Sequence, residues 1–126
     1  MIDDKIRKYN RVIIGEDDKV DVNIVSISNY KGEAVLRPIA VDPIDVGAYG
    51  MKFICRYQLT KGAKIGMTIR LYDKKIETVS IVVRVEKVDI KYNVAVSFIG
   101  LTEYQVLILS SYIKRKTVDS IRKLRE

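Results

Sequence analysis

The middle of the chain alternates apolar and polar residues at every second position, and this period constrains the fold more than any other feature. Between residues 65 and 72, for example, the apolar series on one face is Ile65, Met67, Ile69 and Leu71. Successive side chains of a β-strand point to opposite faces of a sheet, so a period of two predicts strands with one buried face.

Six strands are predicted from this alternation and from the turn residues between the segments. Their ranges are Val20–Ser28, Glu33–Val41, Met51–Leu59, Ile65–Tyr72, Ile76–Val88 and Tyr92–Ile99. In the fifth strand we expect the inward residues to be Val79, Ile81, Val83 and Val85, and the outward residues to be Ser80, Arg84 and Glu86. No helical pattern separates the strands, and closing a sheet removes the edges that invite aggregation. The predicted fold class is therefore mainly β: a small six-stranded antiparallel β-barrel with a C-terminal α-helix.

After Gly100 the apolar period changes from that of a strand to that of a helix. Thr102 and Gln105 have the spacing of a capping box, in which each side chain bonds the backbone N–H of the other residue. One helix is predicted from Glu103 to about Leu124. A chain of 126 residues has room for one domain, in which we expect a flexible basic arm (1–12), a barrel (13–101) and the helix (102–126).

The net charge of +7 lies mainly at the two ends of the chain. Residues 1–11 hold four basic and two acidic residues, residues 114–126 hold six and two, and residues 12–113 are nearly neutral, with 13 and 12. A basic excess suggests an anionic partner, but this distribution argues against a nucleic-acid-binding face across the sheet. The 8 Tyr and 2 Phe residues are also scattered, whereas stacking on bases would need them interleaved with basic residues. No DNA or RNA partner is expected.

The basic end of the predicted helix keeps a thin apolar stripe that consists of Val118, Ile121 and Leu124. Such a segment is compatible with a solvated helix end, a membrane-surface element, or a helix that binds a partner or a second copy of the chain. We favour the solvated or self-associating alternatives, which include a homodimer through this helix.

The absence of His and the presence of a single Cys, Cys55, exclude most metal sites, Ser/His and Cys/His nucleophile pairs and disulfides. Cys55 belongs to the apolar series of its strand, so we expect a buried structural thiol. Asp17 and Asp18 stand in a polar turn and are interpreted as solvated charges. The sequence therefore predicts a protein that is not an enzyme and that needs no cofactor or metal.

The N-terminal residues are charged and lack the apolar core of a signal peptide. No apolar run approaches the roughly 18 residues that would span a membrane. We expect a cytoplasmic protein that is not integral to a membrane.

Arg7 and Arg11 stand four residues apart just before the first expected strand. A guanidinium group is a planar fork that binds phosphate or the edge of guanine through two hydrogen bonds and stacks on purines. Two such groups near a flexible end could enclose an anionic nucleotide. An ordinary solvated basic arm is the alternative.

A second candidate is the glycine-containing turn that begins at Asp45 and includes Gly47 and Gly50. Glycine lets the backbone turn sharply and lets a ligand approach its amide groups. The Asp45 carboxylate could accept hydrogen bonds from the N–H groups of guanine. An ordinary β-turn is the alternative.

Together, in this order, these motifs resemble the PilZ family of cyclic di-GMP receptors, which carries an Arg-x-x-x-Arg arm before the first strand and an Asp/Asn-x-Ser-x-x-Gly turn before a later one. Arg7 and Arg11 match the first motif, and Asp45 and Gly50 match the second. Gly47 stands where the family has Ser, so one hydroxyl contact to the ligand is missing. Ile6 stands where the family often has another Arg.

The resemblance implies a cyclic di-GMP receptor whose ligand-binding residues are Arg7, Arg11, Asp45, Gly47 and Gly50. It also implies a protein partner in the motility, adhesion, pilus or polysaccharide-export machinery. The alternative is an adaptor of the same fold that has lost ligand binding through the change at Gly47.

Overall fold

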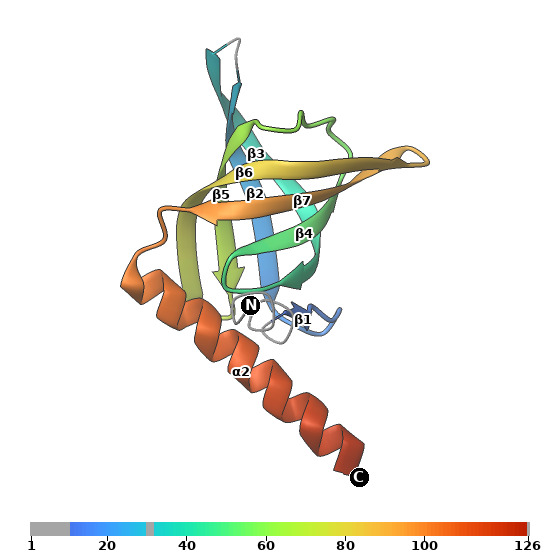
Figure 1. The fold of residues 1–126 in the computed structure, drawn as a ribbon, viewed down its shortest axis with the longest axis vertical. Coiled ribbons are helices and arrows are strands. Elements are labelled where there is room, and N and C mark those ends of the chain that lie inside the picture. Colours follow the sequence, from blue (N-terminus) through green and yellow to red (C-terminus); the bar gives the residue numbers. More distant parts are fainter. Residues whose placement is uncertain (1–10, 30–31, 126) are drawn as a thin grey trace, which may run out of the picture.

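The structure, a computed structural model, describes residues 11–29 and 32–125 (Figure 1). The N-terminal arm before Arg11, including Arg7, therefore lies outside the described residues. The described elements are the strands β1 (Val12–Ile13), β2 (Val20–Asn29), β3 (Gly32–Val46), β4 (Gly50–Cys55), β5 (Lys64–Leu71), β6 (Lys74–Val88) and β7 (Lys91–Ile99), and the helix α2 (Glu103–Arg125).

Strands β2 to β7 form a closed antiparallel barrel, which confirms the predicted fold class. The strand order is β3-β2-β5-β6-β7-β4, and pairing of β3 with β4 closes the ring. The short strand β1 pairs with the last residues of β3, beyond the point where β2 leaves that strand. All of these pairings are antiparallel. From β2 onward, consecutive strands pair with each other except β4 and β5, which lie apart in the ring.

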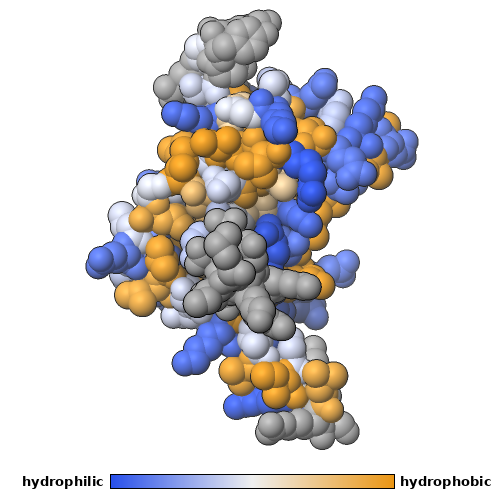
Figure 2. Space-filling view, in the orientation of Figure 1, coloured by the Kyte–Doolittle hydropathy of each residue, from blue (hydrophilic) through white to orange (hydrophobic). Residues whose placement is uncertain are grey.

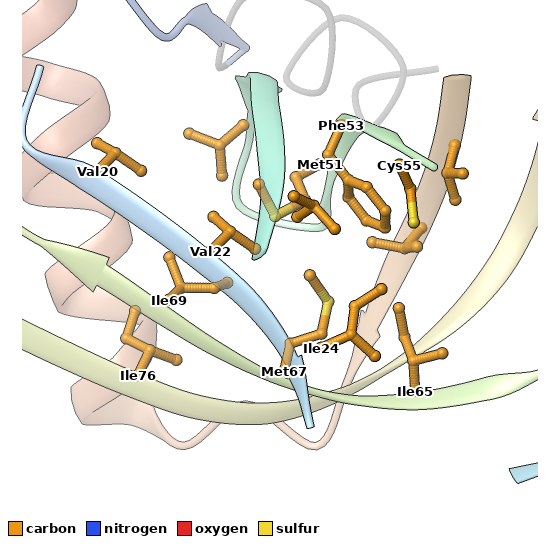
Figure 3. Close-up of a cluster of buried hydrophobic side chains, with 14 of the residues drawn as sticks. Val20, Val22, Ile24, Met51, Phe53, Cys55, Ile65, Met67, Ile69 and Ile76 are labelled. Carbon is orange, nitrogen blue, oxygen red and sulfur yellow. The ribbon is translucent and has the colours of Figure 1, made fainter. Parts of the chain in front are cut away.

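The barrel interior is filled by the apolar series that the alternation predicted (Figure 3). Its largest fully buried side chains are Phe53, Ile24, Met51, Ile65, Met67, Ile69 and Ile76. Cys55 is buried among them as expected. Burial raises the pKa of the Cys55 thiol, despite a hydrogen bond from the backbone N–H of Tyr57.

The inward residues of β6 differ from the prediction. Ser80 and Val82 point into the core, whereas Val79 and Val83 are 44% and 45% exposed. The reason is the register of the β5–β6 hairpin. Its two-residue turn at Tyr72 places Ser80 directly opposite Ile65, and because Ile65 points inward, Ser80 does too. An irregularity between Val82 and Arg84 then shifts the parity by one residue, so only the last part of the strand follows the expected order.

Strand β3 is longer than predicted, because it continues through Pro43 to Val46. Proline lacks a backbone N–H, and an irregularity between Pro43 and Asp45 accommodates it there. The backbone carbonyl of Ile44 meanwhile accepts a hydrogen bond from Ile14, just after β1. Asp45 therefore lies at the end of a strand and not inside a turn.

Helix α2 begins with the predicted capping box. The Thr102 N–H donates to Oε1 of Gln105 at 3.0 Å, and the Gln105 N–H donates to Oγ1 of Thr102 at 3.1 Å. The Gln105 amide also donates to the carbonyl of Glu77, which ties the helix to β6. Leu109, Tyr112 and Ile113 of the helix are buried, and beyond them α2 projects past the barrel (Figure 1). No described helix is long and apolar enough to cross a membrane.

Candidate functional site

Arg11 and Asp45, one residue from each predicted motif, meet in an ion pair. Arg11 immediately precedes β1, and the pairing of β1 with β3 places Ile13 opposite Asp45. Nε of Arg11 donates to Oδ1 of Asp45 at 2.8 Å. The pair uses Nε, so the two terminal amino groups of Arg11 remain free of hydrogen bonds to the described residues. Strand pairing thus joins two motifs that are 34 residues apart in the sequence.

The turn after Asp45 is held by backbone hydrogen bonds at both ends. The Gly47 N–H donates to the carbonyl of Gly50, and the Phe98 N–H donates to the carbonyl of Tyr49, at 2.9 and 2.8 Å. Gly47 is buried, so its backbone contributes to the packing of the turn.

Gly50 is required by the barrel itself. A Cβ atom at this position would overlap the carbonyl oxygen of Val96 on the neighbouring strand β7. Only glycine lets the two backbones approach this closely. The glycine of the second motif therefore has a packing function in this chain, whether or not a ligand approaches it.

A pocket of about 430 Å³ lies beside this turn, on the outer surface of β4, β7 and β6. Its lining residues are Arg11, Tyr49, Gly50, Lys52, Val83, Arg84, Ala95, Val96 and Ser97. Lys52 of β4 and Arg84 of β6 both lie opposite Ala95 of the intervening strand β7. Ala95 has a small side chain, so the two cations flank a shallow floor.

Sequence reasoning did not identify Lys52, Arg84 and Ser97 as site residues, although they line this pocket. The alternation indicates an outward side chain at Lys52, and Arg84 was expected outward. Nothing in the sequence, however, indicates that β7 lies between their strands. The Ser97 hydroxyl is 3.5 Å from the Tyr49 carbonyl and so stands at the turn that lacks the family's Ser.

The pocket suits an anionic ligand. It is lined by the cations of Arg11, Lys52 and Arg84, and the neighbouring Asp45 offsets one of these charges. Lys52 and Arg84 form no ion pair with any other residue in the described part of the chain. No group of three or more His, Cys, Asp and Glu residues that could hold a metal occurs among the described residues.

Searches with protein-family models and of curated proteins found no match. Among solved structures, the PilZ domain of YcgR from Escherichia coli with c-di-GMP has a TM-score of 0.66 at 8% identity, over 92% of this chain and 95% of that one. The Bacillus subtilis inhibitor of motility MotI/DgrA scores 0.65 at 17% identity, over 86% of this chain and 50% of that one. The MrkH–c-di-GMP complex of K. pneumonia scores 0.61 at 14% identity, over 91% and 52%.

The chain has a PilZ-like fold. It spans about half the length of the MotI/DgrA and MrkH chains and nearly all of the YcgR PilZ domain. At identities of 8 to 17%, this structural similarity shows the fold alone.

Asp18 corrects one expectation, because it is not a solvated charge. In the PilZ-like barrel it accepts hydrogen bonds from Lys116 Nζ and the Gly15 N–H at 2.8 Å, and from the hydroxyls of Tyr112 and Tyr72 at 3.1 and 3.3 Å. Burial alone would raise the pKa of Asp18, but the hydrogen bonds from Lys116, Gly15 and Tyr112, together with the positive charge of Lys116, lower it below its usual value. Asp18 thus joins the segment after β1 to helix α2 and to the β5–β6 turn.

Proposed function

We propose that the chain is a cytoplasmic receptor for cyclic di-GMP that relays the level of this messenger to a protein partner in motility, adhesion or polysaccharide export. The observation that carries the proposal is the Arg11–Asp45 pair at the rim of a basic pocket. The PilZ-like fold supports it, because the YcgR domain and MrkH were solved with c-di-GMP.

The ligand has two phosphates and two guanines, and the pocket offers groups that complement both. Arg11 would bind a phosphate or a guanine edge through its terminal amino groups, and Arg7 would supply a second guanidinium from the arm. Lys52 and Arg84 would neutralise phosphate charge from the outer face of the barrel. Asp45 would accept hydrogen bonds from guanine N–H groups while it keeps Arg11 oriented.

Replacing Arg11 with Ala is expected to weaken cyclic di-GMP binding about tenfold or more, since a hydrogen-bonded charge contributes roughly 1.5 to 3 kcal/mol. Isothermal titration calorimetry of the full chain measures the effect. Arg70→Ala is the matched control, because Arg70 is exposed on β5 and lies outside the pocket.

Cyclic di-AMP serves as the ligand control in the same titration and is expected to bind more weakly than cyclic di-GMP. Absence of binding by the natural chain at high micromolar ligand would overturn the receptor proposal. Equal affinities of the natural chain and Arg11→Ala would do the same.

The second candidate function is an adaptor of the same fold that has lost the ligand, and Gly47 favours it. On the receptor proposal, the natural chain binds and Gly47→Ser strengthens binding roughly three- to tenfold by adding one hydrogen bond. Binding of cyclic di-GMP by Ser97→Ala is measured alongside, because Ser97 lines the pocket. Binding that appears only in Gly47→Ser would favour the adaptor over the receptor.

A further inference from the structure

One side of α2 presents a continuous exposed face that the proposed ligand site does not include. At spacings of three and four residues, it consists of Tyr104, Leu107, Ser111, Lys114, Val118 and Ile121, which we call the outer face of α2. Leu107 is 64% exposed and Ile121 is 47% exposed. An average spacing of 3.5 residues is that of the seam along which two helices supercoil around each other. Figure 2 shows apolar surface where α2 projects beyond the barrel.

The N-terminal end of this face, at Tyr104, Leu107 and Ser111, borders a groove of about 360 Å³ between α2 and the β5–β6 turn. Tyr72 and Asp73 of the turn form one wall, and Tyr104, Leu107 and Arg115 of the helix belong to the other. The Arg115 guanidinium carbon lies 5.1 Å from the centre of the Tyr72 ring. The groove is therefore apolar and aromatic at its base, with a cation at its rim.

Tyr72 holds the turn in an unusual backbone conformation. Its φ of 60° lies in the left-handed region, which a bulky residue adopts at a cost. Hydrogen bonds compensate, from the Tyr72 N–H to the Lys19 carbonyl and from the Tyr72 hydroxyl to Asp18. These contacts keep the aromatic wall of the groove in a defined position.

Positive charge accompanies the apolar face. Lys114 lies within the outer face, Arg122 lies beside it, and Lys74 and Arg115 line the groove, where Asp73 is the acidic member. Lys114 and Arg122 form no ion pair with any other residue in residues 11–29 and 32–125. An occupant that buries Leu107, Val118 and Ile121 would therefore also need carboxylates for these cations.

We infer that the outer face of α2 and the adjoining groove bind an acidic amphipathic helix of a protein partner. Apolar side chains of that helix would pack on Leu107, Val118 and Ile121, and one of them would enter the groove beside Tyr72. Its Asp and Glu residues would face Lys114 and Arg122. The face from Leu107 to Ile121 is about 21 Å long at 1.5 Å per residue, which matches a partner helix of about four turns.

A second copy of the chain fits this surface less well, because two outer faces of α2 would bring Lys114 and Arg122 against like charges. A flat anionic membrane fits less well too, because it would not fill the concave groove beside Tyr72. The inference deepens the adaptor part of the proposed function. It does not depend on cyclic di-GMP, so its test omits that ligand.

The test measures binding of a fluorescent amphipathic peptide to the full chain by anisotropy. The peptide has about 18 residues, with Leu at the a and d positions of each heptad and Glu at e and g. A second peptide carries Lys in place of every Glu. We expect the acidic peptide to bind at least about tenfold more tightly than the basic one.

Two double variants locate the site. Leu107→Ala with Ile121→Ala, and Lys114→Glu with Arg122→Glu, are each expected to weaken binding of the acidic peptide about tenfold. The charge-matched control is Lys64→Glu with Arg70→Glu, on exposed positions of β5. All of these side chains are exposed, so the variants are expected to fold.

Failure of the acidic peptide to bind, equal binding of the two peptides, or an equal loss in the control variant would overturn the inference. Binding to phosphatidylcholine vesicles with about 25% phosphatidylglycerol, in place of the peptide, would assign the face to a lipid surface. A dimer that disappears in the Leu107→Ala and Ile121→Ala variant would assign it to a second copy. Both of these results would also overturn the inference, whereas failure of cyclic di-GMP binding would leave it standing.

Discussion

Gly50→Ala is expected to destabilise the folded chain by about 3 kcal/mol, more than substitutions at exposed glycines. The added Cβ would overlap the backbone carbonyl oxygen of Val96, and a backbone atom held in a sheet cannot rotate aside as a side chain can. Gly50 pairs with Ser97 where β4 begins, so the strain falls on the contact between β4 and β7. Separation of these strands would open the barrel.

Urea unfolding followed by circular dichroism measures the free energy of unfolding of Gly50→Ala. Gly15→Ala is the matched control, because its Cβ would lie 3.6 Å from the nearest atom, in ordinary contact. The free energies of unfolding of the two variants should therefore differ by most of the expected loss of about 3 kcal/mol. Equal stability of both would contradict the packing function of Gly50. Loss of ligand binding by Gly50→Ala alone would not establish contact with the ligand, because the fold itself changes.

Asp18→Ala is expected to destabilise the folded chain by about 3 kcal/mol, because it leaves several donors without their acceptor. Only 12% of the Asp18 side chain is exposed, and Lys116 and Tyr112 of α2 both bond its carboxylate. Burial and the nearby carboxylate raise the pKa of Tyr112, so its hydroxyl stays protonated and continues to donate. Removing Asp18 would therefore loosen α2 from the segment after β1.

The stability that Asp18 contributes should depend on pH. Its pKa in the folded chain lies below the unfolded value of 3.8, so protonating the carboxylate requires a lower pH in the folded chain than in the unfolded chain. The contribution is fully present above that unfolded value and is lost as the pH falls through the lower folded pKa.

Urea unfolding at a series of pH values from neutral to strongly acidic checks this dependence. Asp18→Asn is expected to lose less stability than the natural chain over the acid range, since it has no charge to protonate. The neighbouring Asp17→Asn is the control and should keep the pH profile of the natural chain, because Asp17 is exposed. Parallel profiles of Asp18→Asn and the natural chain would contradict the assigned linkage.

The candidate site could be predicted only in part. Arg11 and Asp45 were identified from their motifs, and the structure brings them into contact. Arg7 lies outside the described residues, so its participation stays a prediction. Lys52 and Arg84 could not be paired from the sequence, because they lie 32 residues apart and meet across β7.

The sequence by itself determined the six strands of the barrel, apart from some of their ends, and where the capping box starts the helix, whereas the short strand β1 was not predicted. These features depend on the period of apolar residues and on local hydrogen bonds, which neighbouring residues specify. Only the tertiary structure decided which face of β6 turns inward, that Asp18 is held by donors from three segments, and which cations share a pocket. Each of these depends on strand register and on contacts between residues far apart in the chain, and a register shift of one residue would reverse the faces of a strand.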